Sequence, residues 1–80
     1  MKKYTDGGKL RAVICNQCGK KLAVEDGIVR EGFFGVSKNW GFFSEKDGEI
    51  HRWDLCESCY DELAAGFRIE IETEEQVEFI

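Results

Sequence analysis

Apolar and polar residues alternate in two parts of the chain, and this alternation predicts strands. Residues 9–14 alternate weakly and end in an apolar run, and residues 67–72 alternate apolar with charged side chains. A period of two residues places the apolar side chains on one face of a strand. We therefore expect a strand over residues 9–14 and a closing strand over residues 67–72.

A β-hairpin is predicted over residues 40–55. Two runs rich in aromatic and apolar residues flank Asp47-Gly48, a dipeptide that is typical of a two-residue hairpin turn. This turn places Phe42 opposite Trp53, with both rings on one face of the sheet. In a chain this short, we expect four aromatic rings to lie in the core rather than to form a stacking platform for nucleic acid. They are the rings of Trp40, Phe42, Phe43 and Trp53.

A helix is predicted over residues 55–65, directly after the hairpin. Apolar side chains recur there at helical spacing, and Gly66 follows them. Asp54 is expected to cap this helix, with Glu57 three residues later completing a capping box. Residues 31–38 follow no clear pattern and are assigned to no element.

The four cysteines form two pairs, each with two residues between its members. The pairs are Cys15-Asn16-Gln17-Cys18 and Cys56-Glu57-Ser58-Cys59. Each pair can occupy two corners of a tetrahedron, so two pairs complete the ligand set of one soft divalent metal, most often zinc. Gly19 allows the sharp turn that a zinc knuckle requires after the first pair. Cys56 and Cys59 fall in the first turn of the predicted helix, where the helix dipole favours thiolates.

Three other uses of the same sulfurs are open. Disulfides are typical of secreted mini-proteins, but residues 1–8 contain no apolar stretch or cleavage site of a signal peptide. A thioredoxin-like redox pair requires a βαβ unit, for which the chain has no room. A rubredoxin-like iron centre uses two matched knuckles, whereas a helical pattern follows Cys59. We therefore expect one structural zinc ion in a cytoplasmic protein.

The chain has 80 residues and a net charge of −5, which fits one small domain that needs a metal to complete its core. Residues 1–21 carry +5, from six basic and one acidic side chain, and residues 22–80 carry −10, from five basic and fifteen acidic ones. We interpret residues 1–8 as a flexible basic arm, residues 9–72 as the zinc-binding domain and residues 73–80 as an acidic C-terminal segment. Contact of the basic end with nucleic acid is an alternative, which the overall negative charge disfavours. We expect no membrane association, because no apolar run is long enough to span a bilayer.

Four segments between residues 15 and 67 carry a resemblance to known proteins. They are Cys15-Asn16-Gln17-Cys18-Gly19-Lys20, Trp40-Gly41-Phe42-Phe43-Ser44, Lys46-Asp47-Gly48-Glu49 and Asp54-Leu55-Cys56-Glu57-Ser58-Cys59-Tyr60-Asp61. With these segments the chain resembles a group of small, uncharacterised bacterial proteins of treble-clef or zinc-ribbon type with paired CxxC motifs. The resemblance implies a metal-binding module with four ligands, which are Cys15, Cys18, Cys56 and Cys59.

The expected fold is a small α+β domain stabilised by a metal. A knuckle, a hairpin and a helix in this order are typical of a treble-clef zinc finger, here with an added C-terminal strand. A zinc ribbon is the nearest alternative, but it usually presents both ligand pairs on glycine-containing knuckles.

We expect no enzymatic activity, because four thiolates fill the coordination sphere of zinc and leave no position for water or substrate. His51 has no catalytic partner in the sequence, so we expect a structural or surface role for it. The expected function is that of a zinc-binding interaction module that binds a protein partner or a second copy of itself. The second face of the hairpin and the strand after Phe67 are the expected surfaces. A nucleic-acid-associated regulator and an iron electron carrier are the alternatives.

Overall fold

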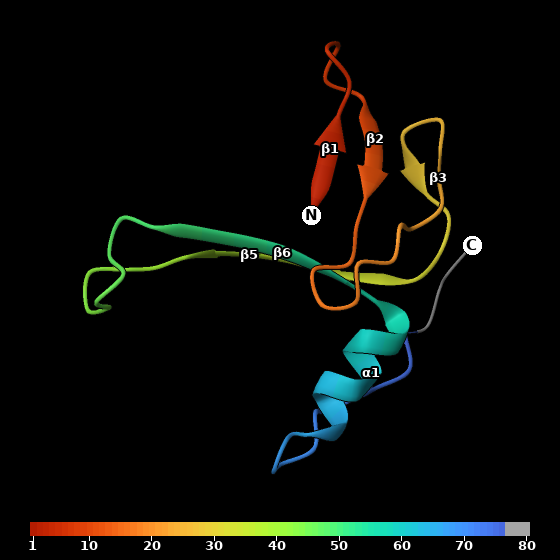
Figure 1. Ribbon diagram of the computed structural model, residues 1–80. Coiled ribbons are helices and arrows are strands. Elements are labelled where there is room, and N and C mark those ends of the chain that lie inside the picture. Colours follow the sequence, from red (N-terminus) through yellow and green to blue (C-terminus); the bar gives the residue numbers. More distant parts are fainter. Residues whose placement is uncertain (77–80) are drawn as a thin grey trace.

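The computed structural model describes residues 1–76, which contain three two-stranded antiparallel sheets and one helix (Figure 1). The elements are β1 (Lys2–Tyr4), β2 (Leu10–Val13), β3 (Val24–Glu25), β4 (Ile28–Val29), β5 (Phe33–Asn39), β6 (Ile50–Cys56) and α1 (Glu57–Ala65). The predicted class, a small α+β domain, is confirmed. No helix within the described part of the chain combines the length and apolar character that crossing a membrane requires.

The first sheet corrects the prediction of a flexible arm over residues 1–8. β1 pairs with β2, with Lys2 opposite Val13, and the chain turns back between them, where the Gly8 N–H donates to the Thr5 carbonyl at 2.9 Å. The strand predicted over residues 9–14 is confirmed as β2. The arm is ordered because pairing satisfies the backbone groups of β2 and because the Met1 ammonium group is held by the body of the protein.

The second sheet is a short hairpin of β3 and β4. It is closed by a two-residue turn of the kind that was predicted for Asp47-Gly48. Its central residues are Asp26 and Gly27, with φ values of 51° and 78°. Positive φ at both central residues is the mark of a type I′ turn. Asp47 has a negative φ, and only Gly48, at 91°, has a positive one. The dipeptide Asp47-Gly48 therefore cannot form this turn.

The third sheet pairs β5 with β6 in a register that differs from the predicted one. Trp53 lies opposite Val36, not Phe42, and Leu55 lies opposite Phe34. The residues between the strands form a ten-residue loop, residues 40–49, which turns three times through i to i+3 hydrogen bonds. The stretch that showed no clear pattern thus supplies the partner strand, because its apolar residues can cover the side chains of β6.

The long β5–β6 hairpin projects away from the rest of the molecule (Figure 1). Its outer loop carries Phe42 and Phe43, which are 84% and 99% exposed. The prediction that these two rings lie in the core is therefore wrong, whereas Trp40 and Trp53 are half-buried on the hairpin. The register explains the difference, because it places residues 42 and 43 beyond the end of the ladder.

The closing strand predicted over residues 67–72 is also absent, since residues 67–76 join no sheet. After α1 the chain runs back beside the helix (Figure 1), and Ile69 is 83% exposed. Alternation of apolar and charged residues produces a strand only where the segment pairs with a sheet edge, and residues 67–76 run beside α1 instead (Figure 1). Part of the acidic segment predicted over residues 73–80 lies outside the described residues.

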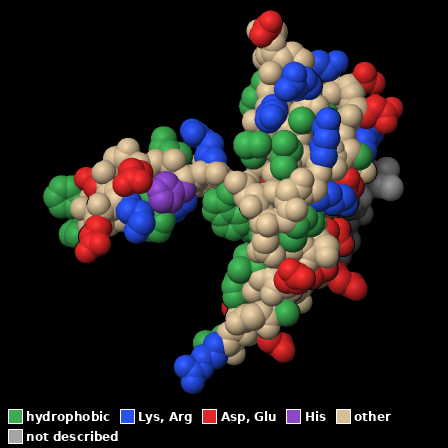
Figure 2. All heavy atoms as spheres, viewed as in Figure 1, with side chains coloured by type: hydrophobic (Ala, Val, Ile, Leu, Met, Phe, Trp, Pro, Cys, Tyr) green, Lys and Arg blue, Asp and Glu red, His purple; other side chains and the backbone are tan. Residues whose placement is uncertain are grey.

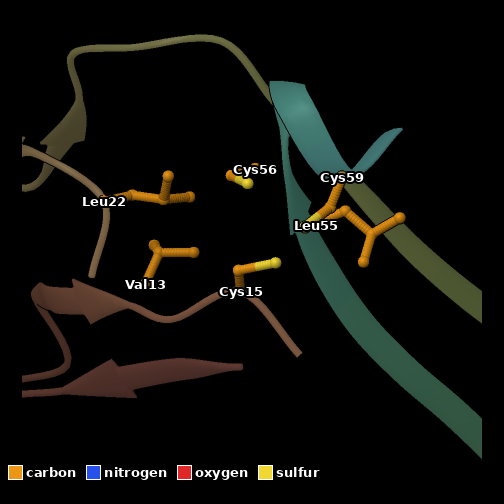
Figure 3. Packing of buried hydrophobic residues seen from close by; sticks show 6 residues of the cluster. All are labelled: Val13, Cys15, Leu22, Leu55, Cys56 and Cys59. Atoms are coloured by element: carbon orange, nitrogen blue, oxygen red, sulfur yellow. The ribbon is translucent and has the colours of Figure 1, made fainter. Parts of the chain in front are cut away.

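The core lies where β2, the first cysteine pair, the end of β6 and the start of α1 meet. Its buried cluster contains six residues: Val13, Cys15, Leu22, Leu55, Cys56 and Cys59. Half of this cluster is cysteine, so the core and the candidate metal site are one structure (Figure 3).

Candidate metal centre

The first cysteine pair lies on a knuckle that the backbone closes tightly. The Cys15 N–H donates to the Lys20 carbonyl at 2.9 Å, and the Gly19 N–H donates back to the Cys15 carbonyl at 3.0 Å. Gly19 has a φ of 80°, the left-handed conformation predicted for it, and a bridge between Ile14 and Lys21 completes the turn. The predicted knuckle is confirmed.

Backbone N–H groups of this knuckle point at the sulfur atoms. The Cys18 N–H lies 3.5 Å from Cys15 Sγ, and the Lys20 N–H lies 3.4 Å from Cys18 Sγ. Such contacts orient the sulfurs and stabilise negative charge on them. The knuckle is therefore arranged for thiolate ligands.

The second pair lies at the junction of β6 and α1. Cys59 is in the first turn of the helix as predicted, while Cys56 is the last residue of β6 and occupies the N-cap position in an extended conformation. Both sulfurs thus lie at the positive end of the helix dipole. The predicted helix over residues 55–65 begins two residues later than expected, at Glu57.

Asp54 does not cap the helix, contrary to prediction. It is 3% exposed within β6, and its carboxylate accepts hydrogen bonds from the Met1 ammonium group at 2.8 Å and from Lys2 Nζ at 2.5 Å. Burial raises the pKa of Asp54, but the hydrogen bonds and charges of these two cations outweigh burial and hold the pKa below its usual value. The capping prediction failed because the two partners of the Asp54 carboxylate are 53 and 52 positions away in sequence.

Asn16, between the two cysteines of the first pair, links this ion pair to the metal centre. Its Oδ1 atom accepts hydrogen bonds from the Met1 ammonium group at 2.7 Å and from the Asp54 N–H at 2.9 Å. The Asn16 N–H donates to the Asp54 carbonyl at 2.7 Å. Sequence reasoning missed this contact. The only signal was the polar residue directly after Cys15.

The four sulfur atoms lie within 4.8 Å of one another, and all four cysteines are free of disulfides. Zinc bonded to sulfur at about 2.3 Å in a tetrahedron requires sulfurs about 3.8 Å apart. Cys18 Sγ and Cys56 Sγ are 3.8 Å apart. Figure 3 shows the sulfurs of Cys15 and Cys56 on the same side of Val13 and Leu22, facing the space toward Cys59. The residues present fit one tetrahedral metal ion.

The electrostatics of the site favour a bound cation. Burial raises the pKa of Cys15, but N–H groups of Cys18, Cys56 and Gln17 outweigh it and lower the pKa to about 6. Burial and the neighbouring sulfurs raise the pKa of Cys59 far above its usual value. The backbone thus stabilises the thiolate of Cys15. A second thiolate, at Cys59, requires a positive ion between the sulfurs.

His51 lies outside this cluster. Its Nε2 atom is 3.0 Å from Glu49 Oε1, and its ring packs edge-on against Trp40 at 5.7 Å on the projecting hairpin. Within residues 1–76, the group of side chains close enough to hold a metal ion consists of the four cysteines.

Neither a protein-family model, nor a curated protein, nor a solved structure matches this chain. The resemblance to the group of small bacterial proteins therefore stays a prediction. Function has to be inferred from the cysteine cluster and the surfaces around it.

Proposed function

We propose that this chain is a non-enzymatic interaction module of treble-clef type, stabilised by one zinc ion bound to Cys15, Cys18, Cys56 and Cys59. The observation that carries the proposal is the approach of all four sulfurs to within 4.8 Å of one another at the centre of the only buried cluster in residues 1–76. The order of the elements, a knuckle, a hairpin and a helix, supports the treble-clef assignment.

Zinc is favoured over iron by the way the two ligand pairs are held. The first pair lies on a knuckle with N–H groups aimed at sulfur, while the second pair lies at a helix N-terminus. An iron electron carrier of rubredoxin type uses two matched knuckles to tune its potential. The unequal pairs here fit a structural site, for which zinc is the usual metal.

The absence of enzymatic activity is proposed from the ligand set. Four cysteines satisfy tetrahedral zinc, and three of them are buried. A catalytic zinc site keeps one position open for water or substrate. In this site, an open coordination position would require one of the four sulfurs to dissociate from the zinc ion.

Interaction with a protein partner or with a second copy is supported by the exposed apolar residues of the hairpin, above all Phe42 and Phe43. Binding to nucleic acid has less support, because Lys2 is paired with Asp54 and Lys20 with Glu31. These two lysines belong to the basic region that would contact phosphates.

Metal analysis tests the proposal directly. Protein purified under reducing conditions should contain one zinc per chain, and X-ray absorption should show four sulfur neighbours at about 2.3 Å. Replacing Cys59→Ser should lower zinc affinity and unfold the domain. Ser58→Ala is the matched control, because Ser58 lies in the same helical turn with an exposed side chain.

Two results would contradict the proposal. One is a folded chain that keeps its circular dichroism spectrum after complete removal of metal. The other is a red protein with bound iron, which would favour the electron carrier.

A further inference from the structure

The outer loop of the β5–β6 hairpin, residues 40–49, is here called the tip loop. Its Phe42 and Phe43 rings contact each other edge to face at 5.4 Å, and both are almost fully exposed. Apolar side chains gather at the far end of the hairpin in Figure 2. Two adjacent exposed phenylalanines at the end of a projecting hairpin form an apolar surface for binding another molecule.

The tip loop is also acidic. It carries three acidic side chains, Glu45, Asp47 and Glu49, against one basic side chain, Lys46, which gives a net charge of −2. Lys46 Nζ lies over the Trp40 ring, 4.9 Å from its centre, and so turns back toward the hairpin. The partner of the tip loop should therefore offer apolar surface together with positive charge.

The protein has a surface of this kind along one face of the same hairpin, next to β1. We call it the basal groove, a hollow of about 800 Å³ between β1 and the β5–β6 sheet. Tyr4 and Phe33 give it apolar walls. Its charged groups are the Met1 ammonium group, Lys2 and Arg52 against Asp54, which sum to +2.

Arg52 is the free cation of the basal groove. Lys2 and the Met1 ammonium group are bound to Asp54, whereas Arg52 is exposed and forms no ion pair within residues 1–76. Arg52 is thus available to a carboxylate that enters the groove.

We propose that the tip loop of one copy binds the basal groove of a second copy, so that two chains form a reciprocal dimer. Phe42 and Phe43 would pack against Tyr4 and Phe33, and an acidic side chain of the tip loop would pair with Arg52. The charges of −2 and +2 are complementary. This inference rests on the proposed function as an interaction module and identifies its partner as the same chain.

The shape of the hairpin allows each of the two copies to bind the other in the same way. The basal groove follows one face of the hairpin from Phe33 to Ser37, whereas the tip loop begins at residue 40, beyond the last pair of the ladder. Two hairpins placed antiparallel about a twofold axis bring each tip loop to the other copy's groove. The tip loop points away from its own groove, because it continues the hairpin outward beyond the last pair of the ladder, Asn39 and Ile50 (Figure 1).

The area is sufficient for a specific contact. Each phenylalanine buries about 150–250 Å², so the four rings of two tip loops bury about 600–1,000 Å² before the groove surfaces are counted. A specific interface needs about 1,000 Å² in total. An anionic membrane is a poorer partner for the same rings, because the tip loop is itself negative.

Sedimentation equilibrium of the zinc-loaded full chain tests the proposal. The wild-type protein should dimerise, and its dissociation constant should rise in about 1 M salt, where the screening length is about 3 Å. The double variant Phe42→Ser, Phe43→Ser should raise the constant about 100-fold or more. Arg52→Glu should raise it about 10-fold. Ile69→Ser removes an equally exposed apolar side chain outside both surfaces and should leave the constant unchanged.

Contacts can be located in the same samples. In a dimer of labelled and unlabelled chains, isotope-filtered NMR should connect the Phe43 ring of one chain with the Tyr4 ring of the other. A wild-type monomer at every concentration, a dimer that survives loss of both phenylalanines, or contacts to another surface would overturn the proposal. So would wild-type binding to anionic vesicles in place of self-association. Metal content distinguishes the two proposals: a zinc-loaded monomer overturns the dimer only, and a metal-free dimer overturns the zinc site only.

Discussion

Asp54 stabilises the fold through an ion pair that joins the first strand to the last. Its buried carboxylate binds Lys2 and the Met1 ammonium group, and its backbone binds Asn16. Replacing Asp54→Asn leaves two cations without a counter-charge and should lower the free energy of unfolding by about 2 kcal/mol at pH 7. Urea unfolding measures this change. Asp61→Asn, an exposed acid on α1, is the control and should have almost no effect.

The pH dependence of this effect has a defined sign. The pKa of Asp54 is lowered in the folded state, so its contribution is fully present above the unfolded value of about 3.9 and is lost as the pH falls through the lower folded value. The difference between wild type and Asp54→Asn should therefore stay constant from about pH 7 to about pH 5. A difference that shrinks within this range would contradict the ion pair.

The knuckle depends on the left-handed backbone conformation of Gly19, and a substitution at this position tests that dependence. A methyl group added there meets open space, but φ is 80° and a side chain is strained in that conformation. Gly19→Ala should lower the free energy of unfolding by about 1–2 kcal/mol and weaken zinc binding with it. Gly41→Ala also enters open space but lacks the positive φ, so it should cost much less. Equal effects of both variants would show that the knuckle does not depend on this conformation.

At the scale of elements, the turn between β3 and β4 is the one that depends on an Asp-Gly dipeptide. Asp26→Val puts a β-branched residue at a φ of 51° and should cost about 1–2 kcal/mol in the free energy of unfolding. Asp47, in the second Asp-Gly dipeptide, has a negative φ, so Asp47→Val should leave the free energy of unfolding nearly unchanged. Thermal unfolding of the two variants compares them, and the opposite ranking would favour the hairpin register predicted from sequence.

Elements fixed by neighbouring residues could be predicted from the sequence. The knuckle follows from two cysteines and Gly19 within a few positions, and the helix follows from apolar residues at helical spacing over residues 55–65. The β5–β6 register could not be predicted, because two Asp-Gly dipeptides offered the same turn and only φ distinguishes them. Pairing residues 33–39 with β6 depends on which apolar side chains cover β6, which is a property of the assembled fold.

The closing strand predicted over residues 67–72 failed for a related reason. Alternation describes the two faces of a possible strand, but it says nothing about a free sheet edge nearby. The capping role predicted for Asp54 failed because a distant ion pair holds the carboxylate more strongly than a helix N-terminus. Local patterns thus predict an element only where no distant contact competes.

At the scale of the whole molecule, the metal site and the core depend on each other. Three of the six buried cluster residues are cysteines, so a metal-free core would contain sulfurs that repel one another when charged. Removing metal with a chelator should unfold β2, β6 and α1 together. Hydrogen exchange should show protection lost at Val13 and Leu55 in one step, and protection retained at either residue would contradict a single cooperative core.

The grouping of the four cysteines was the most predictable feature of the molecule. Tetrahedral coordination imposes the spacing of each pair, so the pattern is visible without knowledge of the fold. The projecting hairpin was not predictable in this way. The exposure of Phe42 and Phe43 depends on the register of β5 and β6, and apolar residues are otherwise expected inside.

The pairing of Phe33 with Cys56 has a consequence for the speed of folding. Along the chain, 37 residues (19–55) separate the two cysteine pairs, but once the hairpin has formed only 14 (19–32) remain to be closed. Because closure entropy grows with the logarithm of loop length, this saves about 0.9 kcal/mol, or about fourfold in the probability of closure. An early hairpin would therefore help a zinc ion held by the first pair to capture the second. The outer half of the hairpin is not part of the loop of residues 19–32 that has to close. Its length can therefore vary without slowing the binding of the second cysteine pair to the zinc ion.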